Sequence, residues 1–283
     1  MSLVEQAIII DAANLSVILL GVGLLATQLL KRWPLVEFAP LPAQFNGRVQ
    51  SRPFDTPELI LAFALIGIYY FSVWLDVRAE DIPKAIVSSW RILGGYLNMG
   101  VVFAIIIVMG FVRQHDLVEL WGLDRMNPKN VVISSVMLVL STVLTLLVMQ
   151  LFYVLFLKDA IGEAPAQESI QQLRKDRSLG MIVTLIISAC IIAPILEEVL
   201  FRGFLYPVLK RFTPPIIAAL IVSGIFAAVH SNLGGLVPLG VLSLMLILVY
   251  EITGTLWSAM LVHAGFNLCN IIMVLSESPT TDG

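Results

Sequence analysis

Two adjacent carboxylates and an arginine interrupt one of the most apolar stretches of the chain, residues 193–203. On insertion scales a charged side chain at the centre of a bilayer costs about 2.5–3.5 kcal/mol, so three that faced lipid would cost about 8–10 kcal/mol. That sum is comparable to the net stability of a whole domain, about 5–15 kcal/mol. In a membrane, Glu197, Glu198 and Arg202 must therefore face a protein interior or a water-filled cavity.

The composition indicates that the setting is a lipid bilayer. Of 283 residues, 58% are hydrophobic and 13% are charged, and the mean hydropathy is +0.93. A soluble domain carries about 25% charged residues, so we expect an all-α, multi-pass integral protein of the cell membrane. The net charge of -3 provides no basic surface for nucleic acid. Cys190 and Cys269 form no Cys-x-x-Cys pattern, so neither a disulfide framework nor a thiolate zinc site is indicated.

Apolar segments near the length needed to cross a bilayer, about 20 residues, predict eight transmembrane helices around a polar intramembrane cavity. Their expected ranges are 8–30, 58–75, 92–112, 131–157, 179–211, 215–230, 236–252 and 255–275. Residues 1–178 are expected to form scaffold helices and loops, residues 179–275 a catalytic helical core, and residues 276–283 a disordered tail.

Two polar connections interrupt the expected scaffold. Residues 113–130 contain a Leu-Trp-Gly-Leu run at 120–123 and His115, which we interpret as a solvated side chain. Residues 158–178 are expected to include a surface helix, because Ile170 and Leu173 lie three positions apart on one side. Near the end of the seventh expected span, Glu251 is interpreted as interfacial.

Three of the polar side chains in the last four expected spans lie at a similar depth. With a rise of about 1.5 Å per residue, Glu197, His230 and His263 each fall well inside a bilayer about 30 Å thick when their helices are measured from a common face. This agreement indicates one shared site rather than separate buried polar groups.

Helical spacing separates the two glutamates. Glu198 and Arg202 are four residues apart with the acid first, which is the favourable order for an ion pair. Glu197 points about 100° away on the helix, so it is expected to be the free, reactive carboxylate. Pro194 removes a helix hydrogen bond just before the two acids.

These groups fit the hydrolysis of a carbonyl compound. Glu197 with His230 can hold and deprotonate a water, while His263 and Asn267, four residues apart, can donate to the resulting oxyanion. A second interpretation is a zinc site, because Glu197, His230 and His263 form a His₂Glu ligand set. No serine or cysteine lies beside a histidine on a compatible helix face, which disfavours an acyl-enzyme route.

Three patterns occur in order: Glu-Glu-x-x-x-Arg at 197–202, Phe-x-x-x-His at 226–230 and His-x-x-x-Asn at 263–267. Together they resemble the motifs of the CPBP intramembrane proteases, which include CAAX prenyl endopeptidases of the Rce1 type and bacterial Abi-type proteins. The resemblance covers about residues 179–275. It implies an all-helical membrane peptidase that acts on a peptide or a lipidated protein and uses a glutamate-activated water without a metal, with zinc as the alternative.

Two further functions stay open at this stage. The chain could be a non-catalytic scaffold or immunity-type protein that retains the family fold. It could also be a transporter whose glutamates and histidines relay protons, although the sequence shows no repeated halves. The sequence carries no signal for the oligomeric state.

Overall fold

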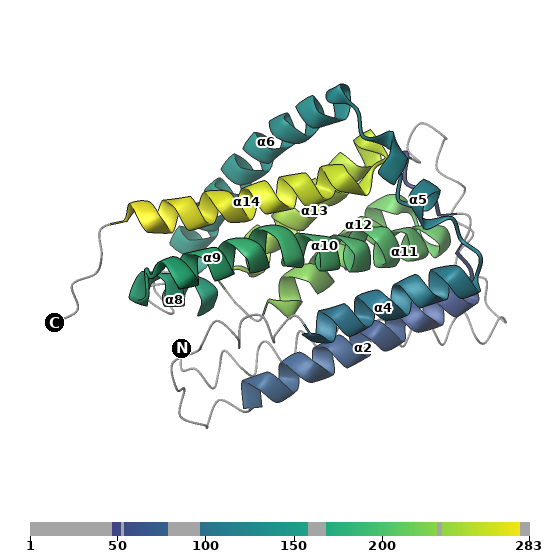
Figure 1. Cartoon of the computed structure of the whole chain (residues 1–283), viewed down its shortest axis with the longest axis horizontal. Helices are drawn as coiled ribbons and strands as arrows, with labels where there is room; N and C mark the ends of the chain where they lie inside the picture. Colours follow the sequence, from purple (N-terminus) through teal and green to yellow (C-terminus); the bar gives the residue numbers. More distant parts are fainter. Residues whose placement is uncertain (1–46, 52–53, 79–96, 158–167, 231–233, 278–283) are drawn as a thin grey trace.

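The computed structural model describes residues 47–51, 54–78, 97–157, 168–230 and 234–277 (Figure 1). Over these ranges every regular element is a helix. The expected all-α class is therefore confirmed for the part of the chain that the structure describes.

Four helical stretches are long and apolar enough to cross a membrane: 128–156, 179–212, 236–253 and 256–276. Shorter apolar helices occupy 56–67, 99–112 and 215–229. These stretches coincide with seven of the expected spans and support an integral membrane protein. The first expected span, 8–30, lies outside the described residues, so the count of eight helices and the enclosed polar cavity stay predictions.

The main helices of the described ranges follow one another along the chain. Before the fifth expected span they are α2 (Thr56–Arg78), α4 (Leu97–Val112), α5 (Leu117–Leu120), α6 (Pro128–Phe152) and α8 (Glu168–Lys175). The fifth span is one continuous helix made of α9 (Leu179–Ile187), η5 (Ser188–Ile192), α10 (Ala193–Glu198), η6 (Val199–Leu205) and α11 (Tyr206–Phe212). After it come α12 (Pro215–Val229), α13 (Leu236–Thr253) and α14 (Leu256–Ser276).

The segments η5 and η6 are π-helical, and each ends just before a proline. Pro194 follows η5 and Pro207 follows η6, and neither has an N–H to donate to the preceding turn. The prolines therefore account for the local widening of the helix, and each frees carbonyl groups that need a donor from elsewhere.

One apolar core joins the expected scaffold to the expected catalytic region, since it contains side chains from Val49 to Phe266. Helix α14 packs against α6, α10, α13 and η5, whereas α4 packs against α10 and η6, and α2 against α11 and α12. Figure 1 shows α14 in yellow running along the green helix that contains α9 and α10. The helices that precede residue 179 therefore support the helices that carry the polar motifs.

Glu251, which is expected to be interfacial, makes several hydrogen bonds that the sequence did not predict. Its carboxylate accepts hydrogen bonds from Tyr206 Oη at 2.6 Å, from the Lys210 ammonium, and from the Val49 N–H at 3.1 Å. Lys210 also donates to Val49 O at 3.1 Å. The cluster fastens the segment at residues 48–49 to α11 and α13.

The expected surface helix is confirmed as α8, whose Leu173 is fully buried. Just after α8, Arg177 donates to the Val274, Leu275 and Glu277 carbonyls at the end of α14. Helix α14 continues to Ser276, and Glu277 accepts a bond from Arg174 at 3.1 Å, whereas the expected disordered tail at 276–283 stays a prediction. Residues 278–283 lie outside the described ranges.

Gly122 allows close contact between two loops. Its φ of +61° is in the left-handed region, and a Cβ at this position would lie 1.9 Å from Gly254 O. Since that oxygen belongs to the backbone, no side-chain rotation relieves the contact. We therefore predict that Gly122→Ala lowers the free energy of unfolding by about 1–3 kcal/mol, measured as thermal unfolding in detergent.

Gly180→Ala is the matched control, because a Cβ there meets nothing within 4 Å. The control should unfold at the wild-type temperature or slightly above it, since alanine favours a helix. Equal stability of the Gly122→Ala variant would contradict the close contact.

Candidate active site

The expected Glu198–Arg202 ion pair is present and completely buried. Arg202 Nη1 donates to Glu198 Oε1 at 2.9 Å, and neither side chain has any exposed surface. The Arg202 guanidinium also lies over the Phe226 ring, with Cζ 4.6 Å from the ring centroid. A buried pair of this kind is stable only when further polar contacts compensate the lost hydration.

Ser243 supplies one such contact, and the sequence did not indicate it. Arg202 Nη2 donates to Ser243 Oγ at 2.8 Å and to Ser243 O at 3.3 Å. Ser243 lies on α13 and is fully buried. A single serine in an apolar helix is a weak signal, because its partner becomes known only once the helices are packed.

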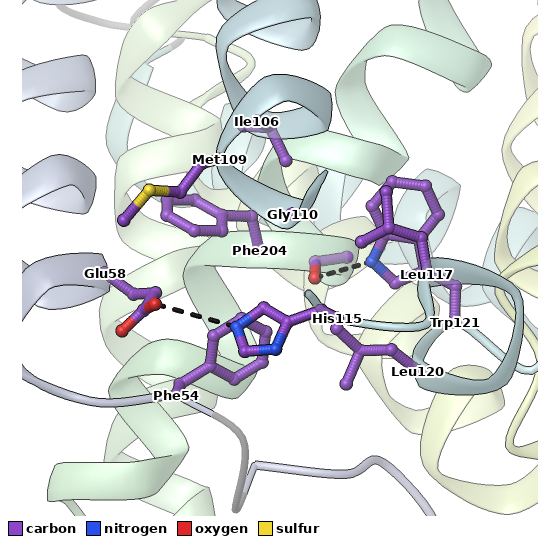
Figure 2. Close-up of a pocket in the computed structure, with 11 residues that line it drawn as sticks. Phe54, Glu58, Ile106, Met109, Gly110, His115, Leu117, Leu120, Trp121 and Phe204 are labelled. Carbon is purple, nitrogen blue, oxygen red and sulfur yellow. Dashed lines mark hydrogen bonds and ion pairs between the residues drawn. The ribbon is translucent and has the colours of Figure 1, made fainter. Parts of the chain in front are cut away.

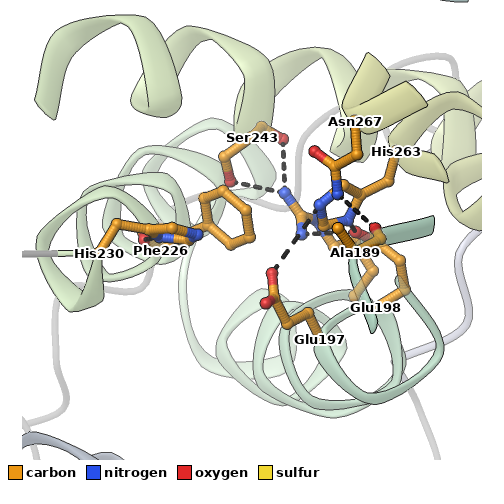
Figure 3. A network of polar contacts seen from close by, with 9 residues as sticks. Ala189, Glu197, Glu198, Phe226, His230, Ser243, His263 and Asn267 are labelled. Atoms are coloured by element: carbon orange, nitrogen blue, oxygen red, sulfur yellow. Dashed lines mark hydrogen bonds and ion pairs between the residues drawn. The ribbon is translucent and has the colours of Figure 1, made fainter. Parts of the chain in front are cut away.

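His263 on α14 joins the same carboxylate. Its Nδ1 lies 2.8 Å from Glu198 Oε1, and because an ionised carboxylate only accepts hydrogen bonds, Nδ1 is the donor. The order of contacts is therefore Ser243 on α13, Arg202 on η6, Glu198 on α10 and His263 on α14 (Figure 3). The sequence predicted that His263 and Glu198 belong to one site, but not that they are bonded to each other.

Glu197 lies outside this chain of bonds. Its Oε2 is buried, accepts no hydrogen bond from the described residues, and lies 3.9 Å from His263 Nε2. The two glutamates therefore differ as the helical spacing predicts: Glu198 is held by a cation, and Glu197 faces the second nitrogen of His263.

His230 ends α12 and contacts the cluster through Phe226. Its Nδ1 donates to Phe226 O at 2.7 Å, which leaves Nε2 available as a proton acceptor. The Phe226 ring centroid is 4.8 Å from that of His230 and 6.0 Å from that of His263. Among the described residues no hydrogen bond joins His230 to Glu197, so their expected joint hold on a water stays a prediction.

Asn267 is anchored to the continuous helix from α9 to α11, the candidate catalytic helix, which carries Glu197 and Glu198. Its Nδ2 donates to Ala189 O at 2.7 Å. In η5 the Ala193 N–H bonds to Ser188 O. With the same spacing, Ala189 O would need the N–H of residue 194, but that residue is a proline and has none. Asn267 supplies that missing donor, and the second hydrogen of its amide remains for an oxyanion.

The described side chains do not form the expected zinc ligand set. No group of three or more His, Cys, Asp and Glu side chains within the described ranges converges to hold a metal ion. Glu197 approaches His263, whereas His230 contacts the aromatic face of Phe226. The zinc interpretation of Glu197, His230 and His263 stays a prediction, because no contact in the described residues joins His230 to the other two side chains.

The interpretation of His115 as a solvated side chain is wrong. The side chain is only 14% exposed, packs edge-on against Phe54, and places Nε2 3.6 Å from Glu58 Oε1. Glu58 is itself buried and accepts bonds from the Asp55 N–H at 2.8 Å and from Arg113 Nε at 2.7 Å. Polar neighbours in the sequence suggested solvent, but α2 and the segment before it cover the imidazole.

The buried ion pair leads to a prediction about stability. Arg202→Met leaves Glu198 buried without its guanidinium, and losing one partner of a buried pair lowers the free energy of unfolding by about 3–5 kcal/mol. The double variant Glu198→Gln/Arg202→Met removes the uncompensated charge and should recover most of that loss. Thermal unfolding in detergent measures both, and a single variant as stable as the wild type would contradict the assignment.

The comparisons with known proteins identify the region that holds this cluster. Residues 179–269 match the family described as type II CAAX prenyl endopeptidase, Rce1-like. No curated protein and no solved structure matches the chain. The matched segment begins with α9, ends within α14, and contains every candidate residue: Glu197, Glu198, Arg202, His230, His263 and Asn267. This segment is therefore similar to the Rce1-like family of type II CAAX prenyl endopeptidases, and the match supports a CAAX protease of the CPBP type.

Proposed function

We propose that the protein is an endopeptidase of the cell membrane that hydrolyses a peptide bond of a membrane-associated or lipidated protein with a water activated by Glu197. The family supports the peptidase class. One observation carries the choice of base: Glu198 Oε1 accepts bonds from both Arg202 and His263, whereas Glu197 accepts no bond from a cation, although one buried oxygen of each carboxylate, Oε2, has no donor among the described protein groups. A buried carboxylate oxygen needs a donor, and a water or a substrate N–H would provide it.

In the proposed reaction Glu197 takes one proton from the water as its oxygen attacks the carbonyl carbon of the peptide bond. The carbonyl oxygen becomes an oxyanion in the tetrahedral intermediate. When the carbon–nitrogen bond breaks, the leaving amine receives the proton that Glu197 took from the water, which restores the Glu197 carboxylate, and the new carboxyl group keeps the oxygen of the water. No residue forms a covalent bond to the substrate.

The charges of the cluster favour His263 as an oxyanion donor. Glu197 and Glu198 carry two negative charges, and Arg202 carries one positive charge. A protonated His263 makes the buried cluster neutral, and a neutral cluster costs less to bury than a charged one. The imidazolium then donates from Nδ1 to Glu198 and from Nε2 to the oxyanion.

His230 and Asn267 fill the remaining roles. The bond from His230 Nδ1 to Phe226 O fixes the ring and leaves Nε2 to exchange a proton with the water or the leaving amine. Asn267 can use its second amide hydrogen on the oxyanion while its first stays on Ala189 O. We propose a reaction in which Glu197 activates the water without a metal ion.

Glu197→Gln should abolish cleavage and leave the unfolding temperature unchanged, because the amide keeps the shape of the side chain but cannot take a proton. The assay is cleavage of lipidated and unlipidated peptides by the purified protein, with and without a strong chelator. Glu119→Gln is the control, since Glu119 is an exposed glutamate on α5.

Cleavage that survives the chelator and is lost only in Glu197→Gln supports the proposal. Cleavage lost to the chelator and restored by zinc contradicts the metal-free reaction. A wild-type protein that cuts none of the peptides contradicts the proposed activity itself and favours the non-catalytic interpretation.

Asn267→Ala should lower kcat by about 10²–10³ if its amide stabilises the oxyanion. The KM should change little, since the contact forms only in the transition state. Steady-state kinetics on the wild type and the variant measure both quantities. Lower thermal stability with an unchanged kcat would show that the bond to Ala189 O is the only role of Asn267.

A further inference from the structure

Trp121 connects the two helices that carry the candidate active site, although it lies outside the segment that matches the family. It belongs to the Leu-Trp-Gly-Leu run of the loop between α4 and α6, and it is almost completely buried. Its side chain and its backbone bond to different helices of the site, and the proposed reaction assigns it no role.

The indole bonds to the catalytic helix one residue after Arg202. Trp121 Nε1 donates to Gly203 O at 2.9 Å (Figure 2). In η6 the Tyr206 N–H bonds to Phe201 O, and residue 207, which would donate to Gly203 O in an α-helix, is a proline. The indole therefore gives Gly203 O a donor beside a proline that cannot provide one.

Gly203 allows the indole to come this close. A Cβ at Gly203 would lie 3.0 Å from Trp121 Nε1 and 3.2 Å from its Cε2, tighter than ordinary contact. The same position would lie 3.4 Å from Leu256 Cδ2, so the glycine faces both the indole and the first residue of α14.

The backbone of Trp121 bonds to α14. The Leu256 N–H, at the start of that helix, donates to Trp121 O at 2.9 Å. Gly122 and Gly254 bring the adjoining loop and the turn before α14 into backbone contact. Two helical turns after Leu256, α14 presents His263 to Glu198.

A small pocket of about 10 Å³ borders the indole on the side of Glu58 and His115, and Phe204 and Trp121 belong to its lining (Figure 2). The pocket leaves room for little more than a water molecule, so the indole is held both by packing and by its hydrogen bond to Gly203 O.

We propose that Trp121 is a positioning residue of the active site. Its bonds to Gly203 O and to the Leu256 N–H fix the axial register of η6 against α14. That register determines the distances from His263 to Glu197 and Glu198. This inference rests on the proposed function, because it assigns the register of the two helices to the cleavage reaction.

The test compares Trp121→Phe, the double variant Trp121→Phe/Pro207→Ala, and the control Trp257→Phe. Phenylalanine keeps an aromatic ring but cannot donate, and the double variant gives residue 207 an N–H that can reach Gly203 O within the helix. Trp257 is 42% exposed and lies beside the same turn, so it controls for the loss of an indole.

We expect Trp121→Phe to lower kcat by about 10- to 100-fold, since small misplacements of reacting groups have effects of that size, and to leave KM nearly unchanged. The double variant should regain the wild-type unfolding temperature but not the wild-type kcat, because an N–H within the helix satisfies the carbonyl without holding the loop. Trp257→Phe should change neither quantity.

A second readout is independent of catalysis. The chain has three histidines, so nitrogen NMR of labelled imidazoles, assigned with single histidine variants, can follow His263. Its signal should shift in Trp121→Phe and in the double variant, but not in Trp257→Phe. If the wild type cuts no peptide, the proposed function fails, and this shift still tests the positioning role.

Three results would overturn the proposal. The first is a double variant with the wild-type kcat, which would mean that Trp121 only satisfies a carbonyl. The second is a Trp121→Phe protein with an unchanged kcat and an unchanged His263 signal. The third is a double variant that fails to accumulate in the membrane, which would assign Trp121 to folding as a whole.

Discussion

The site depends on one carboxylate oxygen. Glu198 Oε1 accepts hydrogen bonds from both Arg202 and His263, and all three side chains are buried in an apolar helical protein. Removing charges from water is expensive unless each is paired and hydrogen-bonded. Ser243 helps to meet this requirement, because its hydroxyl accepts a hydrogen bond from Nη2 of the Arg202 guanidinium. Because Glu198 is held in this way, we propose that the neighbouring Glu197 is the carboxylate that acts in catalysis. The same contacts join α10, η6, α13 and α14.

The prolines of the catalytic helix provide the second constraint. Each follows a π-helical segment and leaves a backbone carbonyl without its usual donor. Asn267 bonds to Ala189 O after the first widening, and Trp121 bonds to Gly203 O after the second. A residue from α14 and a residue from the loop before α6 thus hold the catalytic helix on either side of its acids. Irregular helix is tolerated inside a membrane protein where neighbouring groups satisfy the freed backbone, and here those groups also border the site.

Much of the fold and part of the site follow from the sequence, because both depend on local spacing. Seven expected spans coincide with described helices, and the i,i+4 pattern separated Glu198 from Glu197 correctly. Contacts between helices could not be read in the same way. Ser243 gave no signal within its own apolar helix, and the burial of His115 requires Phe54 and Glu58, which lie more than fifty residues away. The bond from His263 to Glu198 likewise depends on the register of α14 against α10, which spacing within either helix does not determine.

The central claim is that Glu197 activates a water and does not itself attack the substrate. A single turnover in water enriched in oxygen-18, with enzyme in excess over peptide, tests this claim most directly. If water attacks the peptide carbonyl, every new carboxyl terminus carries one heavy oxygen from the first turnover. If Glu197 attacks, an anhydride forms, and its hydrolysis at the glutamyl carbonyl leaves the heavy oxygen in the side chain of Glu197. Unlabelled product together with labelled Glu197 would therefore contradict the account.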